Sequence, residues 1–227
     1  MCEWLSTSDP SGLLQRLHRQ PLLAVLRSVS LEQARLQLRL LQQAGVAHVE
    51  LAVSADSAWV AMANTLVAEF PGLHLGAASV RTQSALDAAL DAGLTYAVSP
   101  ILDRVLLEHA ARRQVTLVPG VFSPTEITAA VQWGAPAVKL YPAATLGPSY
   151  WRALAGPLHP LPFCIAAGGL AVADAPDWFA AGVDAVALGS TLFLVDAEAV
   201  QLQSDLPDLL AWLSMRNANP APKEWTH

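Results

Sequence analysis

A fourfold internal repeat places the strongest constraint on how this chain can fold. The segments are QQAGVAHVEL, LDAGLTYAVS, VQWGAPAVKL and FAAGVDAVAL, and each joins the end of a predicted helix to a glycine and a short apolar run. A glycine directly after a helix is the usual left-handed C-cap. Gly45, Gly93, Gly134 and Gly182 therefore each mark a turn from a helix into a strand.

The rest of the chain continues this alternation. Strands are predicted at 22–26, 46–52, 73–77, 94–98, 115–119, 136–140, 162–166 and 184–188, and helices at 31–44, 56–69, 82–92, 103–112, 124–133, 148–155 and 174–181. Strands joined by helical crossovers run parallel. Because the repeat falls on alternate strands of eight, we expect an α/β fold, a single-domain (β/α)₈ TIM barrel, rather than an open doubly wound sheet.

The ends of the chain are predicted to flank this barrel. We expect an N-terminal helical segment over residues 1–20, the barrel over 21–199, and a C-terminal helix with a polar tail over 200–227.

Composition limits the class of function. Hydrophobic residues make up 53% of the 227 residues and charged residues 14%, which excludes a disordered chain. A net charge of −6 without a Lys/Arg run argues against a nucleic-acid surface. No signal-like N-terminus or membrane-length apolar run is present, and Cys2 and Cys164 cannot form a disulfide framework. We expect a cytoplasmic protein that acts on a small molecule and binds neither nucleic acid nor a membrane.

The repeat also aligns residues within the predicted barrel. The fifth residue after each glycine is Glu50, Val98, Lys139 or Ala187. In a TIM barrel the four side chains of one interior layer come from alternate strands, so these four are predicted to share a layer. Glu50 and Lys139 would then face each other across the barrel axis, and Val98 and Ala187 would leave space between them.

This pair could carry chemistry. Lys139 is one of only two lysines, the other being Lys223 in the tail. Burial lowers the pKa of an amine toward the range in which the neutral form attacks a carbonyl, and it raises the pKa of a carboxyl group into the range useful for proton transfer. The alternative is structural: Lys139 reaches water at a strand end, or Glu50 is only its counter-ion.

Glycines at two strand ends indicate a phosphate site. AAGGL contains Gly168 and Gly169 after the seventh strand, and ALGST contains Gly189 and Ser190 after the eighth. These two loops often hold a phosphate in TIM barrels, because glycines let backbone N–H groups approach its oxygens. Tight turns without a ligand are the alternative for each glycine pair.

Two further polar residues could bind a substrate carboxylate. Arg27 ends the first strand and could donate two parallel hydrogen bonds, and Ser79 after the third strand could add a hydroxyl. The alternatives are an ordinary rim arginine and a turn or capping serine.

Other polar residues are assigned structural roles. Glu126 belongs to a predicted capping box with Ser123, and His48 is expected on the outer face of its strand. The six histidines lack metal-ligand spacing.

From Pro21 to Phe193 the chain resembles the class I aldolases that cleave 2-dehydro-3-deoxy-6-phosphogluconate (KDPG), its galactonate epimer and 4-hydroxy-2-oxoglutarate (KHG). The motif around Lys139 is the most specific. The resemblance implies a homotrimeric (β/α)₈ barrel without metal or cofactor, a Schiff-base lysine at Lys139, an acid/base at Glu50, and substrate contacts that include Pro100 and Tyr141. The matching segments are AVLR, AGVAHVEL, LGAASV, VSP, LVPG, VKLYPAA, AAGGL and ALGS.

Departures from the family pattern bear on the substrate. The gluconate enzymes have an arginine where this chain has Ser54 and a threonine where it has Ala167. The phosphogalactonate branch lacks both side chains, and its lysine segment continues with a Gly-Pro-x-Tyr like that at residues 147–150. By resemblance, Arg27 becomes the main carboxylate clamp, and Ser79 replaces a family threonine with its hydroxyl retained.

The predicted function is a Schiff-base aldolase. It would cleave a 2-keto-3-deoxy-6-phospho sugar acid to pyruvate and glyceraldehyde 3-phosphate, or 4-hydroxy-2-oxoglutarate to pyruvate and glyoxylate. Two alternatives stay open from the sequence: a phosphate-binding barrel isomerase or epimerase, and a non-catalytic barrel that binds sugar phosphates.

Overall fold

The computed structural model describes residues 9–56, 58–195 and 200–218. Parallel strands form one sheet in the order β5-β4-β3-β2-β1-β9-β8-β7-β6, curled into a nearly closed barrel, so the predicted TIM barrel is confirmed. A strand lies within or across each of the eight predicted ranges. The strands are β1 (Leu22–Leu26), β2 (His48–Ala52), β3 (His74–Ala78), β4 (Tyr96–Val98), β5 (Thr116–Val118), β6 (Gly120–Val121), β7 (Val138–Leu140), β8 (Cys164–Ala167) and β9 (Ala185–Leu188).

The fifth predicted strand, 115–119, contains β5 and ends at Pro119, and the short strand β6, which the sequence does not predict, follows directly. β5 pairs with β4 on one side, whereas β6 pairs with β7 on the other. Proline has no backbone N–H to give to a sheet ladder, so it suits the point at which a strand changes partner. The two edges of the sheet are thus joined by the chain itself.

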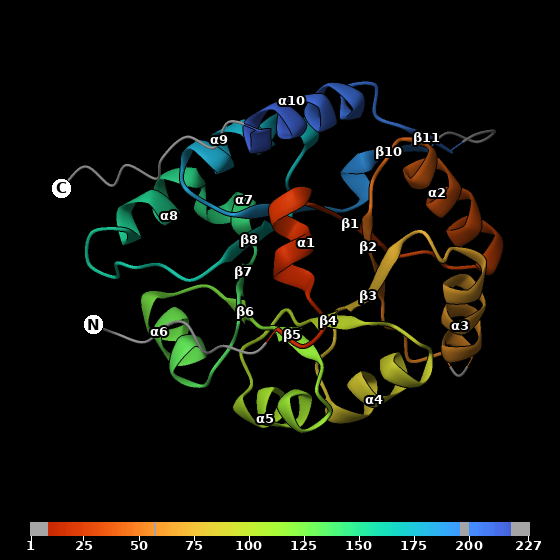
Figure 1. Cartoon of the computed structure of the whole chain (residues 1–227), viewed down its shortest axis with the longest axis horizontal. Helices are drawn as coiled ribbons and strands as arrows, with labels where there is room; N and C mark the ends of the chain where they lie inside the picture. Colours follow the sequence, from red (N-terminus) through yellow and green to blue (C-terminus); the bar gives the residue numbers. More distant parts are fainter. Residues whose placement is uncertain (1–8, 57, 196–199, 219–227) are drawn as a thin grey trace.

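Helices surround the barrel in Figure 1, at the positions that the sequence predicts between strands. The glycines of the repeat have φ angles of 87°, 86°, 81° and 95°, which confirms their role as left-handed caps. The helices are α1 (Leu13–Arg19), α2 (Leu31–Gln43), α3 (Trp59–Glu69), α4 (Gln83–Asp91), α5 (Arg104–Arg112), α6 (Pro124–Gln132), α7 (Ala143–Leu146), α8 (Pro148–Leu154), α9 (Ala175–Ala180) and α10 (Leu206–Ala218), with 3₁₀ turns η1 (Val172–Asp174) and η2 (Ser190–Leu192).

Two apolar cores lie on the two faces of the sheet. In β1, Leu22, Ala24 and Leu26 pack outward with the helices, whereas Leu23 and Val25 belong to a smaller cluster inside the barrel. Successive side chains of a strand point to opposite faces, so one continuous apolar strand serves both cores. This explains why the strands read as unbroken hydrophobic runs.

The N-terminal helix α1 seals one end of the barrel. Leu13 and Leu17 are fully buried and belong to the interior cluster. Asp9 fixes the helix by accepting hydrogen bonds from the Leu13 N–H (3.0 Å) and from the Thr116 hydroxyl at the start of β5 (2.7 Å). In Figure 1, α1 lies across the centre of the ring of strands.

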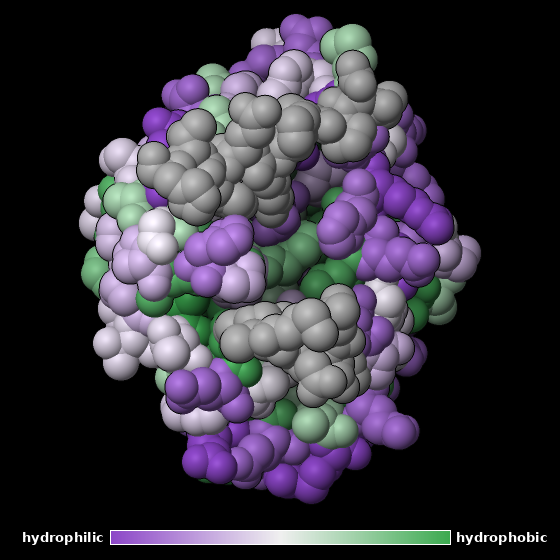
Figure 2. Space-filling model, turned by 60° about the vertical axis from the view of Figure 1, so that its left-hand side comes forward, coloured by the Kyte–Doolittle hydropathy of each residue, from purple (hydrophilic) through white to green (hydrophobic). Residues whose placement is uncertain are grey.

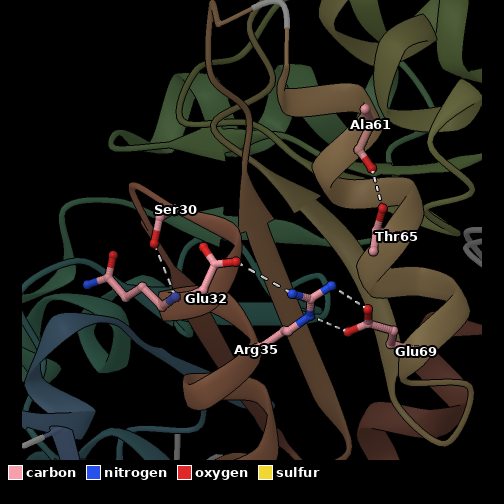
Figure 3. Close-up of polar contacts among 7 residues, drawn as sticks. Ser30, Glu32, Arg35, Ala61, Thr65 and Glu69 are labelled. Carbon is pink, nitrogen blue, oxygen red and sulfur yellow. Dashed lines mark hydrogen bonds and ion pairs between the residues drawn. The ribbon is translucent and has the colours of Figure 1, made fainter.

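Polar contacts join neighbouring helices on the outside. The guanidinium of Arg35 on α2 donates to both carboxylate oxygens of Glu69 on α3, at 2.7 Å and 2.6 Å, and it also lies 3.6 Å from Glu32. Figure 3 shows this arrangement together with the Ser30 N-cap of α2. The capping box predicted for Ser123 and Glu126 at the start of α6 is confirmed as well.

After the barrel, the chain forms an antiparallel pair that the sequence analysis does not predict. β10 (Phe193–Val195) pairs with β11 (Val200–Leu202), on either side of the predicted boundary at residues 199 and 200. The division of the chain at residues 20 and 199 stays a prediction. Cys2 and the tail from 219 to 227, with Lys223, lie outside the described residues.

The described helices and surface add two observations. No helix in the described part of the chain has both the length and the apolar character needed to cross a membrane. Figure 2 turns the left-hand side of Figure 1 forward and shows hydrophobic residues in a hollow, with hydrophilic residues to its left and right.

Candidate active site

Glu50 on β2 and Lys139 on β7 both lie inside the barrel. Their exposed fractions are 0% and 5%, although a charged side chain is rarely buried so completely. Val98 and Ala187 belong to the interior cluster. The placement of these four residues on the barrel interior is therefore confirmed.

Burial shifts the two ionisable groups in opposite directions. It raises the pKa of the Glu50 carboxyl group to about 7, although the positive charges of Lys139 and Arg27 act against this rise. Burial also lowers the pKa of the Lys139 amine, with Glu50 opposing the change and Arg27 adding to it. A carboxyl group that titrates near neutrality and an amine with a lowered pKa are suited to acid/base and nucleophilic catalysis.

No hydrogen bond or ion pair within the described residues engages the Glu50 carboxyl group. Both of its oxygens are buried, and neither has a hydrogen-bond partner among the described residues. Nor do the described ion pairs within 4.0 Å include one between Glu50 and Lys139. Since a buried polar atom normally has a partner, this carboxyl group is free to serve a molecule bound in the barrel.

At the mouth of the barrel, Arg27 and Ser79 come together from positions 52 residues apart. The guanidinium of Arg27, just after β1, donates to the Ser79 hydroxyl after β3 at 3.0 Å. Ser79 has a φ of 63°, in the left-handed region that residues other than glycine rarely adopt. Such strain is concentrated at binding and catalytic sites, and here it accompanies a hydroxyl directed to the arginine.

Tyr141 lies between the lysine and the first glycine pair. Its ring centre is 5.3 Å from the Lys139 ammonium nitrogen. A side chain at Gly168 would come within 2.8 Å of the Tyr141 ring, and one at Gly169 within 2.9 Å of the Ala144 methyl group. Both glycines also have positive φ angles, 96° and 79°. The glycine pair therefore lets the loop after β8 approach the end of β7 closely.

The two predicted phosphate loops are joined to each other. The Thr191 hydroxyl in η2, after β9, donates to the Leu170 carbonyl after β8 at 2.6 Å. Gly189 lies beside the end of β1, where an added side chain would be 3.9 Å from the Val25 carbonyl oxygen, and Ser190 is exposed at the start of η2. The loops thus form one continuous rim at the carboxyl end of the barrel.

Pro100 lies at the same rim, after β4. An added side chain at Gly120 would overlap the Pro100 carbonyl group at 2.4 Å, so the loop after β4 rests on the start of β6. The Lys139 N–H donates to the Pro119 carbonyl at 2.8 Å, which ties this corner to the lysine strand. Each predicted site residue therefore lies inside the barrel or at its carboxyl end, where TIM-barrel enzymes place their active sites.

The prediction for His48 is wrong. His48 is two residues before Glu50 on β2, so both side chains point to the same face of the sheet. It is 2% exposed, stacks on His74, and lies close enough to Arg16 on the sealing helix α1 for their charges to interact. Burial, with the charges of His74 and Arg16, lowers its pKa to about 4.

Sequence reasoning also missed Tyr96. This tyrosine is 1% exposed and belongs to the interior cluster. It stands two residues before Val98, so the same alternation that places Val98 inside the barrel could have found it.

Comparisons with known proteins agree with this geometry. The family model described as "Aldolase: KDPG and KHG aldolase" matches residues 13–208. A "Probable 2-dehydro-3-deoxy-6-phosphogalactonate aldolase" of Rhizobium meliloti (strain 1021) is 30% identical over 174 residues, which cover 77% of this chain and 82% of the relative. A "2-dehydro-3-deoxy-phosphogluconate aldolase" of Dickeya dadantii (strain 3937) is 29% identical over 202 residues, 88% of this chain and 91% of the relative.

A solved structure described as "Native KDPGal structure" has the same fold. The TM-score is 0.72 at 25% identity, and the match covers 88% of this chain and 95% of that one. The barrel, the buried amine and carboxyl group, and these matches lead to one assignment: the chain belongs to the family of KDPG and KHG aldolases, which are lyases.

Proposed function

We propose that this aldolase cleaves a 2-keto-3-deoxy-6-phospho sugar acid through a Schiff base on Lys139. The observation that carries the proposal is the buried pair itself. One barrel interior holds an amine whose pKa is lowered and a carboxyl group whose pKa is raised, and the carboxyl oxygens have no hydrogen-bond partner within the described residues.

In the first half of the reaction, the neutral Lys139 amine attacks the C2 carbonyl carbon of the substrate. Loss of water from the resulting carbinolamine gives an iminium, which withdraws electrons from the C3–C4 bond. Glu50 accepts the proton of the C4 hydroxyl group, the C3–C4 bond breaks, and its electron pair forms an enamine with the iminium. The aldehyde product leaves as glyceraldehyde 3-phosphate.

In the second half, the enamine is protonated at C3 and returns to an iminium. Water then adds to C2, pyruvate leaves, and the Lys139 amine is free again. A carboxyl group with a pKa of about 7 can both accept and return the proton near neutral pH, which suits Glu50 to both halves.

The rim would orient the substrate. Arg27 and Ser79, already hydrogen-bonded to each other, would hold the carboxylate, and Tyr141 would pack beside the iminium, with Pro100 closing that side. The backbone around two strand ends would hold the phosphate, because glycines there leave room for oxygens near N–H groups. These residues are Gly168, Gly169, Gly189 and Ser190.

Within the family, we assign the galactonate epimer before the gluconate epimer. Ser54 is exposed after β2, and Ala167 is buried at the end of β8, so neither position offers the side chain that the gluconate pattern has there. The Rhizobium meliloti relative carries a phosphogalactonate aldolase name, which supports this order. Activity on 4-hydroxy-2-oxoglutarate is the second candidate.

We further propose that the enzyme is a homotrimer in the cytoplasm. Four large apolar side chains are exposed on α5, at the end of α6 or in the loops before these helices: Ile101, Val105, Phe122 and Trp133, with exposed fractions between 38% and 57%. Exposed apolar side chains of this kind support contact with another copy, and a head-to-tail contact closes into a ring when its rotation fits a threefold axis. Light scattering of the purified protein measures the assembly directly.

Trapping tests the chemistry. The protein is incubated with pyruvate and borohydride, digested and weighed, and we expect one reduced pyruvate on the peptide that contains Lys139. Turnover on the galactonate, gluconate and hydroxy-oxoglutarate substrates then ranks the three. The absence of a mass gain at Lys139 would exclude the Schiff base and favour the isomerase or epimerase alternative.

A further inference from the structure

The ring of Tyr96 crosses the inside of the barrel from β4 toward the strand that carries Glu50. Ala77 pairs with Ala97 in the sheet, so Gly76 and Tyr96 are neighbours on β3 and β4. A side chain at Gly76 would lie only 2.3 to 2.5 Å from three carbons of the Tyr96 ring, the one that bears the hydroxyl group being the nearest. Because Gly76 has no side chain, the ring passes over β3.

The far end of this ring reaches β2 beside Glu50. The Tyr96 hydroxyl lies 3.5 Å from the Val49 carbonyl oxygen, one residue before Glu50. In the same register, Gly76 pairs directly with Glu50. The hydroxyl-bearing end of the Tyr96 ring therefore lies over Gly76, the residue that pairs with Glu50 in the sheet.

Both polar groups lack good partners. At 3.5 Å the contact to Val49 is at the long limit for a hydrogen bond, and O–H···O bonds are normally 2.5 to 3.0 Å. The two Glu50 oxygens are buried without a partner within the described part of the chain. A buried donor and a buried acceptor stabilise each other strongly when they pair, since the interior screens them weakly, and the charge of Glu50 already acts on Tyr96.

We propose that Tyr96 is a positioning residue for Glu50: its hydroxyl group turns from the Val49 carbonyl to the Glu50 carboxylate when that carboxylate forms, holding it on the side of the chamber that Lys139 faces. The proposal rests on the aldolase function above, but Tyr96 touches no reacting atom. The other groups whose charges act on this pair are Lys139, Arg27 and Arg16.

The first test measures the protonation of Glu50 without activity. Full-length protein is labelled with ¹³C at the glutamate carboxyl groups, and Glu50→Gln identifies the Glu50 signal. In Tyr96→Phe the ring stays but the donor is lost, so we expect the Glu50 titration midpoint to rise by about one pH unit, because the carboxylate loses one hydrogen bond. Tyr150→Phe is the matched control, since it removes a phenol bonded to the Phe122 carbonyl on another part of the molecule.

A second variant moves the Tyr96 hydroxyl group without removing it. In Gly76→Ala the added methyl group displaces the Tyr96 ring, and the Glu50 midpoint should rise as it does in Tyr96→Phe. A midpoint unchanged from the original protein in the folded variant overturns the proposal.

The second test separates positioning from a merely structural role. We expect Tyr96→Phe to lower kcat about tenfold, less than the ~10² to 10⁴-fold typical of losing a general acid/base, and to shift the acid limb of the pH–rate profile upward. In a Glu50→Gln background the same change should cost nothing further. Equal losses in both backgrounds would contradict a role through Glu50.

Trapping with pyruvate and borohydride keeps the two proposals apart. If the original protein forms no adduct, the Schiff-base function fails, while the carboxyl titration still decides whether Tyr96 acts on Glu50. If adduct forms equally in the original protein and in Tyr96→Phe, the loss of kcat lies in a proton-transfer step, as we expect.

Discussion

The amino end of the barrel, which α1 closes, and the carboxyl end are built from the same alternating strands, but the carboxyl groups toward the two ends differ in their partners. At the amino end, α1 closes the opening with Leu13 and Leu17, and Asp9 uses its carboxylate oxygens on backbone and side-chain donors. At the carboxyl end, Ser79 is held at a positive φ. Deeper in the barrel, Glu50 keeps two buried oxygens without a described partner.

This difference separates residues that maintain the fold from residues that are held ready for a ligand. The hydrogen-bonded carboxylate of Asp9 and the buried leucines of α1 stabilise the protein at the amino end. Strain and unpaired polar groups toward the carboxyl end cost stability, as they commonly do at functional sites. Substitutions at the amino end should therefore lower stability more than activity, whereas substitutions toward the carboxyl end should lower activity more than stability.

The largest effect is expected at Lys139. Lys139→Met should lower kcat/KM by at least ~10⁴-fold, the scale of removing a covalent nucleophile. The free energy of unfolding at pH 7 should rise, because a desolvated amine is replaced by an apolar chain of similar length and Glu50, whose pKa is about 7, takes up a proton when the neighbouring positive charge is lost. Steady-state kinetics and urea unfolding of one preparation measure both. A variant that loses stability together with activity would remove the proposed contrast.

At the sealed amino end, Leu17→Ala should lower stability and leave activity unchanged, the opposite of Lys139→Met. Leu17 is fully buried, so its truncation should lower the free energy of unfolding by about 2–5 kcal/mol, with kcat retained in the protein that stays folded. Urea unfolding monitored by circular dichroism gives the first value. Exposed Gln15→Ala on the same helix is the control and should change stability little. A large loss of kcat in folded Leu17→Ala would show that the two ends are coupled.

His48 makes the sealed end sensitive to acid. Its folded pKa of about 4 lies below the unfolded value of 6.5, so the stability it contributes is present above pH 6.5 and is lost as pH falls toward 4. His48→Gln should therefore flatten the fall in unfolding free energy across this range by about 3 kcal/mol. Exposed His74→Gln should flatten it less, and equal slopes in the original protein and in His48→Gln would contradict the assignment.

The smallest effect tests the strain at Ser79. Both Ser79→Gly and Ser79→Ala lose the hydroxyl that accepts from Arg27, so KM should rise in both. Only glycine relieves the positive φ, and the Gly variant should be more stable than the Ala variant by about 1 kcal/mol. Thermal unfolding compares the pair, and equal Tm values would mean that this backbone position is not strained.

The fold was largely predictable because its signals are local. Glycine caps after helices and short apolar strands recur throughout the chain. Counting five residues from each glycine predicts that Glu50 and Lys139 both lie inside the barrel. What depends on distant contacts was not predictable. The break at Pro119 depends on long-range pairing, since β5 pairs with β4 and β6 pairs with β7. The β10–β11 pair lies outside the glycine repeat, so the repeat does not predict it.

The errors within the site have a similar origin. The alternation that places Glu50 inside also places His48 there, but an isolated histidine in an apolar run gives no sign that a helix from the N-terminal segment covers it. The left-handed backbone at Ser79 is invisible in a sequence where serine is an ordinary turn residue.

The break at Pro119 lies beside the strand that carries Lys139, the proposed nucleophile. Elsewhere in the sheet neighbouring strands are joined by ladder hydrogen bonds, whereas β5 and β6 are consecutive in the chain, and the Gly120 N–H donates to the Ile101 carbonyl after β4 at 3.2 Å. The Lys139 N–H is anchored to the carbonyl of that very proline. One backbone hydrogen bond thus links the break in the fifth strand to the residue that we propose as the nucleophile, so a change in the backbone at Pro119 would also change the position of Lys139.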